Sequence, residues 1–153
     1  MPIFNSKATL EQVHSYLAAS GYFGGSQIGE PKAPPQGVKL FAAVYMMDAS
    51  VTRVYVNGGL AENHVVQIRI YRNALLEPTK DIELELAIAV QQVASDLLGD
   101  YDLGATIREV DAGGMNGTPY KTEWGHVDLG GVVYRVADIT LPLNIDDSAT
   151  AAP

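Results

Sequence analysis

Apolar residues recur at two different periods along this chain, and the changes of period mark its predicted elements. Over residues 8–20, Leu10, Val13 and Leu17 are spaced as on one face of a helix, and Gly21 follows where a helix ends. The sequence therefore predicts a short amphipathic helix near the start of the chain.

A longer helix is predicted from Pro78 to Gly99. Proline suits the first turn of a helix and glycine commonly ends one. One apolar stripe runs along this segment, formed by Ile82, Leu86, Ala89, Val90, Val93 and Leu97. Because Leu84 and Ile88 lie off that stripe, we expect one flank to be buried beyond the domain core, against either the helix over residues 8–20 or another chain.

Extended segments fill most of the remaining chain. Runs rich in aromatic and β-branched residues predict strands over residues 39–48, 50–57, 64–72, 105–111, 121–129 and 132–143. Within the third run, Val66, Ile68 and Ile70 share one face because side chains alternate along a strand. Between the last two runs, Gly130-Gly131 predicts a hairpin turn.

The order of elements is helix, three strands, helix and three strands. It predicts an α+β fold, a mainly antiparallel β-sheet with two helices packed on one face. No internal repeat or linker divides the chain, so residues 1–145 are expected to form a single domain. The small polar tail over residues 146–153 is expected to fray.

Three connections are expected to contact other chains: residues 22–38, 57–63 and 112–120. They are long or rich in glycine, and they carry apolar side chains that are costly to leave in water, namely Tyr22, Phe23, Leu60, Met115 and Tyr120. The first also contains Ile28. Aromatic and aliphatic residues are rare in flexible linkers, so this segment is better interpreted as an arm lying on another surface.

Composition limits the class of protein. The chain has 153 residues, of which 47% are hydrophobic and 18% charged, a balance typical of one globular domain. The absence of cysteine excludes a disulfide framework, a thiol nucleophile and a thiolate metal site. The first residues do not form a signal peptide, and no apolar run has membrane-spanning length, so we expect no membrane partner and a protein used inside a cell.

The charge of the chain argues against nucleic-acid recognition. Its formal net charge is -8, and its ten basic residues are scattered. Arg53, Arg69 and Arg72 come nearest to a patch, but strand alternation puts Arg69 and Arg72 on opposite faces. Tight DNA binding needs several cations on phosphates at once. We therefore expect no tight DNA binding, and also no enzymatic activity and no cofactor.

The stretch GGMNGTPYKT, residues 113–122, has the ingredients of a nucleotide-binding loop. Such a loop needs a strand before it and a helix after it, and its lysine directly follows the last glycine. Here three residues separate Gly117 from Lys121, and a strand is predicted next. We interpret this stretch as a flexible hairpin loop between two strands that binds no nucleotide.

Two further groups of residues leave alternatives open. His126 and Asp128 share a strand face and are the best candidates for metal ligands, but no third ligand is placed by spacing, so a surface pair is the simpler interpretation. Arg69 and Arg135 each interrupt an apolar strand. Three interpretations are open for each arginine: an edge position, a salt bridge to a helix acid, or an ion pair between subunits.

Four stretches of the chain carry a family resemblance. They are GYFGGSQIGEPKAPPQG, VVQIRIYRNALLEPTKDIE, LLGDYDLGATIREVDAGG and GHVDLGGVVYRVADITLPL, which together span most of residues 10–145. In their order, their spacing and the total length of the chain, they resemble the tail terminator proteins of long-tailed bacteriophages, especially phages of actinobacterial hosts.

The resemblance implies a structural virion protein without a cofactor, assembled in the bacterial cytoplasm. Such proteins form a ring of six on the head-proximal end of the tail tube, stop tube polymerisation and bind the head-completion or stopper protein, while DNA passes through as cargo. An acidic wall suits such a conduit because it repels DNA. The residues then expected at subunit or tail-tube contacts are Tyr22, Phe23, Ile28, Leu60, Leu84, Ile88, Met115, Tyr120, Arg69 and Arg135.

Three alternatives belong to other classes. The nearest is another phage neck protein, a head–tail connector or stopper of similar size. A metal-dependent hydrolase would use His126, Asp128 and a distant acid. A bacterial adaptor domain with no role in a phage is the third.

Overall fold

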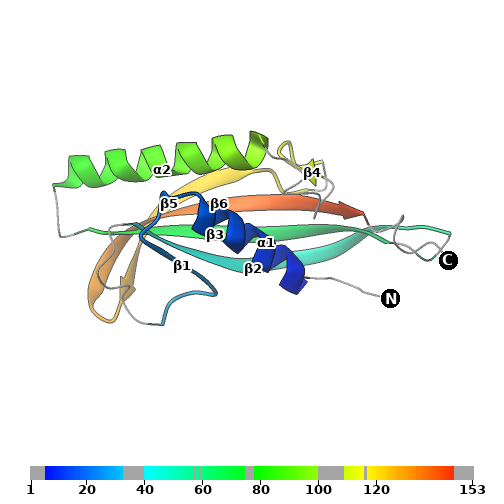
Figure 1. The fold of residues 1–153 in the computed structure, drawn as a ribbon, viewed down its shortest axis with the longest axis horizontal. Coiled ribbons are helices and arrows are strands. Elements are labelled where there is room, and N and C mark those ends of the chain that lie inside the picture. The colour runs from blue at the N-terminus through cyan, green and yellow to red at the C-terminus, as the bar shows by residue number, and fades with distance from the viewer. Residues whose placement is uncertain are drawn as a thin grey trace.

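A single sheet with helices on one side organises the chain (Figure 1). The computed structural model describes residues 6–32, 40–56, 58, 60–74, 78–99, 109–115 and 117–146. In chain order its elements are α1 (Ser6–Ala19), β1 (Gly25–Ile28), β2 (Leu40–Val54), β3 (Leu60–Asn73), α2 (Thr79–Gly99), β4 (Glu109–Val110), β5 (Lys121–Leu129) and β6 (Val132–Asp146).

The sheet has six strands in the order β1-β2-β3-β6-β4, and β5 also pairs with β6. β1 runs parallel to β2, and every other pairing is antiparallel. β5 and β6 form the predicted hairpin. Its turn residues Gly130 and Gly131 have φ angles of 59° and 88°, the positive values that a two-residue hairpin turn of this kind requires.

Both helices contribute to one hydrophobic core on one face of the sheet. Alternate residues of the central strands face them, which are Ala42, Val44, Val66, Ile68, Ile70, Ala137, Ile139, Leu141 and Leu143. Val13 and Leu17 of α1 and Leu86 and Val93 of α2 are buried in this same cluster. The predicted α+β fold, with a mainly antiparallel sheet and two helices on one face, is confirmed.

The opposite face of the sheet, which we call the open face, carries a smaller aromatic cluster. Tyr71 makes edge-to-face contacts with Phe41, at 6.2 Å between ring centroids, and with Tyr134, at 5.9 Å. Ala43 and Val136 complete its buried part, and no described helix residue belongs to it. The two faces of the sheet are therefore covered very differently.

The predicted ends and stripe of the long helix are confirmed. The carbonyl oxygen of Pro78 accepts hydrogen bonds from the backbone N–H groups of Asp81, at 3.0 Å, and Ile82, at 3.2 Å, and the helix runs to Gly99. The stripe residues are buried except for Val90, which is half-buried. In the described part of the chain, neither helix has the length and apolar character needed to cross a membrane.

Some predicted strand boundaries are wrong. Residues 39–48 and 50–57 were expected to form two strands, but β2 is continuous from Leu40 to Val54. Its polar interruptions are absorbed by register shifts between Met46 and Asp48 and between Val51 and Arg53, where the bulged strand carries an extra residue.

The connections also differ from the prediction in part. The segment over residues 22–38 contains a strand, β1, and β3 begins at Leu60 inside the expected loop over residues 57–63. The predicted strand over residues 105–111 is described only from residue 109, where β4 has two residues. The tail beyond residue 146 lies outside the described part, so its expected fraying stays a prediction.

Candidate functional site

Exposed apolar side chains gather at two places on this molecule. The first is the side of α2 that points away from the sheet. We call the part of this surface from Leu84 to Leu98 the outer face of α2, and its exposed residues are Leu84, Ala87, Ile88, Gln91, Gln92, Ser95 and Leu98. Leu84 is 53% exposed and Ile88 is 54% exposed, values unusual for large aliphatic residues of a folded domain.

None of these seven outer-face residues, all of which the structure describes, carries a charge. Two acids of the same helix are held at its flanks, whereas Asp81 in the first turn is exposed. Glu85 accepts a hydrogen bond from Arg72 at 3.0 Å, and Glu83 accepts one from Arg135 at 2.5 Å. Since Arg72 and Arg135 are opposite each other on β3 and β6, these two ion pairs fix the start of α2 to the sheet.

A third acid of α2, Asp96, is also bound by a residue from outside the helix. Tyr22 donates a hydrogen bond of 2.9 Å to Asp96, and this bond raises the pKa of Tyr22. Three acids of α2, Glu83, Glu85 and Asp96, thus bind groups of the fold, and the exposed side chains from Leu84 to Leu98 are uncharged.

Two partners were considered for the burial of Leu84 and Ile88, and the structure tests one of them. Helix α1 was one possible cover for them, but their exposure shows that no described part of this chain buries them. The alternative that α1 covers this flank is therefore wrong. Burial by another chain stays a prediction.

The second apolar surface lies at the far end of the β2–β3 hairpin. Val54 is 69% exposed, Val51 is exposed too, and Val56 is fully exposed. Met47, also exposed, lies earlier on β2 and faces the open side of the sheet. Val51 is opposite Glu62 and Val54 is opposite Leu60 in the register, so both valines lie on the side of the sheet that bears the helices. We call residues 47–56, with their partners on β3, the hairpin arm.

The outer edge of β2 is open along this arm. β1 pairs only with residues Phe41–Val44, and no other described strand pairs with that edge. Unpaired backbone N–H and C=O groups with exposed apolar side chains attract another chain. In Figure 1 the far end of the β2–β3 hairpin reaches past the end of α2.

Several residues expected at contacts with other chains also pack within this chain. Leu60 is only 7% exposed because it lies on the helix-bearing side at the start of β3, so its assignment to an interface loop is wrong. Tyr22, Phe23 and Tyr120 are half-buried against the main core. Burial raises the pKa of Tyr120 to about 12. Ile28 and Met115 are exposed, as an interface residue of the free chain would be.

The two arginines in apolar strands both bind acids of their own chain. Arg135 binds the helix acid Glu83, which is one of the alternatives raised for it. Arg69 lies on the open face and forms a two-pronged ion pair with Asp138, at 2.6 and 3.0 Å. This hydrogen bonding raises the pKa of Arg69, and Glu30 lies 3.6 Å away on its other side.

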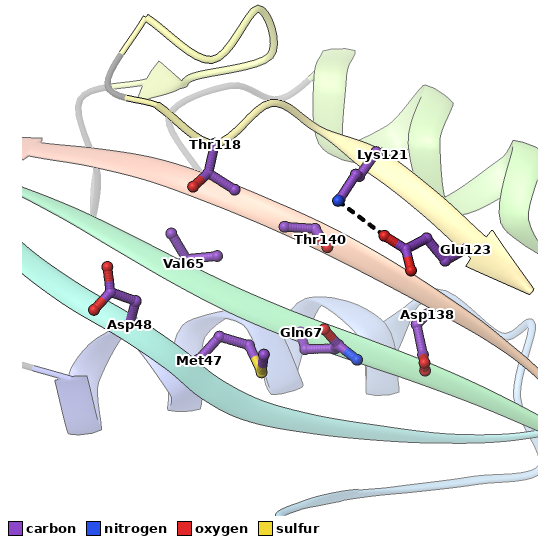
Figure 2. A pocket seen from close by; sticks show the side chains of 9 residues that line it. All are labelled: Met47, Asp48, Val65, Gln67, Thr118, Lys121, Glu123, Asp138 and Thr140. Carbon is purple, nitrogen blue, oxygen red and sulfur yellow. Dashed lines mark ion pairs between the residues drawn. The ribbon is translucent and has the colours of Figure 1, made fainter. Parts of the chain in front are cut away.

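The open face also holds a polar hollow of about 460 Å³, shown in Figure 2. Its lining consists of Met47, Asp48, Val65, Gln67, Thr118, Lys121, Glu123, Asp138 and Thr140. Lys121 and Glu123 pair at 2.8 Å across its rim, which lowers the pKa of Glu123. Beside the hollow, Gln67 donates to the hydroxyl of Tyr45, and burial raises the pKa of Tyr45 to about 12. Gln67, Lys121, Glu123 and Asp138 of this lining thus each have a partner within the chain.

The histidines form no metal site in the described part of the chain, where no group of three potential ligands occurs. Asp128 accepts a hydrogen bond from the backbone of Gly131 and so stabilises the β5–β6 turn. His126 lies on the same strand, in a small hollow between β5 and the start of α2.

A buried polar chain was not anticipated from the sequence. His64 is fully buried, with one ring nitrogen 3.0 Å from the Thr9 hydroxyl and the other 3.2 Å from the Glu62 carboxylate. Through these contacts His64 links α1 to β3 in the interior of the protein. No local motif predicts it, because Thr9 and His64 are 55 residues apart.

The glycine-rich stretch that begins at Gly113 leads into β5 rather than into a helix, as predicted. It is not a hairpin loop, however, because β4 and β5 both pair with β6 and not with each other. Gly114 has a φ of +73°, and a side chain there would meet Pro119 at 2.7 Å, so this turn requires glycine.

Comparison with known proteins adds no family assignment. No protein-family model matches the chain, and no curated protein is significantly similar to it.

Proposed function

We propose that this chain is a tail terminator of a long-tailed bacteriophage. In this proposal it forms a ring of six on the head-proximal end of the tail tube, stops tube growth and presents the surface to which the head docks. It catalyses no reaction, and DNA crosses it as cargo.

The observation that supports this proposal most is the outer face of α2. A solvent-facing helix surface normally carries charged residues, and this one has none from Leu84 to Leu98 in a chain of net charge -8. Leu84, Ile88 and Leu98 would gain free energy by leaving water. The family resemblance of the four sequence stretches then supplies the kind of assembly.

The alternative functions gain less support from the same residues. A hydrolase would need His126 and Asp128 to act together, and Asp128 is engaged in the β5–β6 turn. A connector or stopper would share the ring and the uncharged helix face. It would differ in its partner, because only a terminator binds tail tube subunits directly.

Tube growth is the test of this function. Tail tube subunits are polymerised with and without the purified chain, and tube lengths are measured by electron microscopy. We expect short tubes of narrow length distribution in the presence of the chain. Unchanged lengths, with no chain bound to tubes, would reject the terminator function.

Matched variants connect this assay to the helix surface. Ile88→Glu places a carboxylate on the outer face of α2, and Ala18→Glu places one on an exposed position of α1. An unpaired charge buried in a contact is costly, so Ile88→Glu should abolish length control. Ala18→Glu should behave as the original chain.

A further inference from the structure

We propose that the hairpin arm of one copy lies across the outer face of α2 of the next copy, so that copies associate head to tail. This inference rests on the proposed ring and names the contact that would close it. The hairpin arm of one copy then covers the outer face of α2 on a second copy of this chain.

Charge favours a second copy as the occupant. Two chains that each carry -8 repel wherever their acidic surfaces meet, so a stable contact needs uncharged surfaces. The exposed residues of α2 from Leu84 to Leu98 carry no charge, and Lys80 and Asp81, exposed in the turn before them, cancel. Along residues 47–56 of the hairpin arm, Asp48 and Arg53 cancel. These surfaces can approach each other without like-charge repulsion.

The dimensions of the two surfaces allow this contact. From Leu84 to Leu98, α2 extends about 21 Å at a rise of about 1.5 Å per residue. Val51 and Val54, which project from the helix-bearing side of the arm, are about 10 Å apart at roughly 3.3 Å per residue. The two valines can therefore lie along about half of the apolar length of the helix.

A head-to-tail contact accounts for both surfaces, whereas a symmetric contact accounts for only one. If two α2 helices paired about a two-fold axis, Leu84 and Ile88 would be buried, but the valines of both hairpin arms would stay in water. A contact between two different patches can instead repeat from copy to copy. The copies close into a ring where the rotation between neighbours permits it.

Disulfide cross-linking can test this contact without interference, because the chain has no cysteine. Val54→Cys is placed on the arm and Ile88→Cys on the helix, both at exposed positions. The single variants are oxidised separately and as a mixture, alone and bound to tail tubes, and separated on denaturing gels. Ala18→Cys replaces Ile88→Cys in the control mixture.

We expect the Val54→Cys and Ile88→Cys mixture to give a covalent dimer at least about tenfold above the Ala18→Cys control, since neighbouring thiols reach millimolar effective concentrations. A chain carrying both substitutions should give a ladder that stops at the copy number of the ring. Either result supports the contact.

The other outcomes separate this contact from the ring itself. Rings at tube ends without the mixed cross-link would overturn the arm-to-helix contact and leave the terminator function standing. Dimers from Ile88→Cys alone would show a symmetric helix pair, and cross-links to the tube subunit would assign the helix to the tube. Both would overturn the proposed contact. Bare tube ends would overturn the terminator function.

Discussion

Two leucines on opposite sides of α2 provide a matched test of how this helix is oriented. Leu86 is fully buried in the core, and Leu84, two residues earlier, is 53% exposed. Changing each to alanine removes the same atoms from the same helix. Any difference between the variants therefore reports on the surroundings of the two side chains.

The expected magnitudes differ clearly. Leucine-to-alanine changes at fully buried sites destabilise by about 2–5 kcal/mol, because transfer and cavity costs add. In a domain of this size, Leu86→Ala should lower the melting temperature by about 10 °C. Leu84→Ala should cost less than about 1 kcal/mol, since half of the side chain is already in water and alanine favours helix slightly.

Urea unfolding followed by circular dichroism measures both values, with the chain diluted until it is monomeric so that assembly adds no apparent stability. In assembly, the order of the two effects should be reversed. Leu84→Ala should weaken ring formation on tubes while keeping a nearly original unfolding midpoint. Equal destabilisation by the two changes would refute the orientation of α2 and, with it, the uncharged outer face.

Three further predictions concern the loop before β5, one buried hydroxyl and nucleic acid. Gly114→Ala should destabilise the fold by more than about 1 kcal/mol in urea unfolding, because it combines a positive φ with a clash at Pro119. Gly113→Ala is the control and should be nearly neutral, since the space around Gly113 is open. Equal effects of the two changes would contradict the turn geometry. Burial raises the pKa of Tyr120 to about 12 in the folded chain, from an ordinary value of 10.0. Its contribution to stability is therefore complete below pH 10 and is lost between pH 10 and 12, and Tyr120→Phe should flatten this loss in unfolding measured across that range; an unchanged pH profile would contradict it. The isolated chain should show no sub-micromolar binding of labelled duplex DNA at about 150 mM salt, where even non-specific dissociation constants lie near 10⁻⁴–10⁻⁶ M, and tighter binding would contradict the passive conduit.

Much of the fold could be predicted from the sequence, because it rests on local periodicity. The stripe of α2 and the alternation in β3 are each set by side chains a few residues apart, and a glycine pair marks the β5–β6 turn. β1 could not be found in this way. Its sequence GSQI has no apolar alternation, and its place is fixed by backbone pairing with residues 41–44.

The candidate surfaces were only partly predictable for a related reason. A helical wheel shows that Leu84 and Ile88 lie off the stripe, but only the tertiary structure shows that α1 does not reach them. The open edge of the hairpin arm depends on how far β1 extends along β2. Leu60 was misplaced because its apolar character does not distinguish a buried strand start from an interface loop.

Electron microscopy of tail tubes capped by this chain tests the central claim most directly. Averaged images of the tube ends should show six copies closed in one ring on the head-proximal end, with the β2–β3 hairpin of each copy over α2 of its neighbour. Tube ends without added density, or copies bound along the tube wall as separate monomers, would contradict the account.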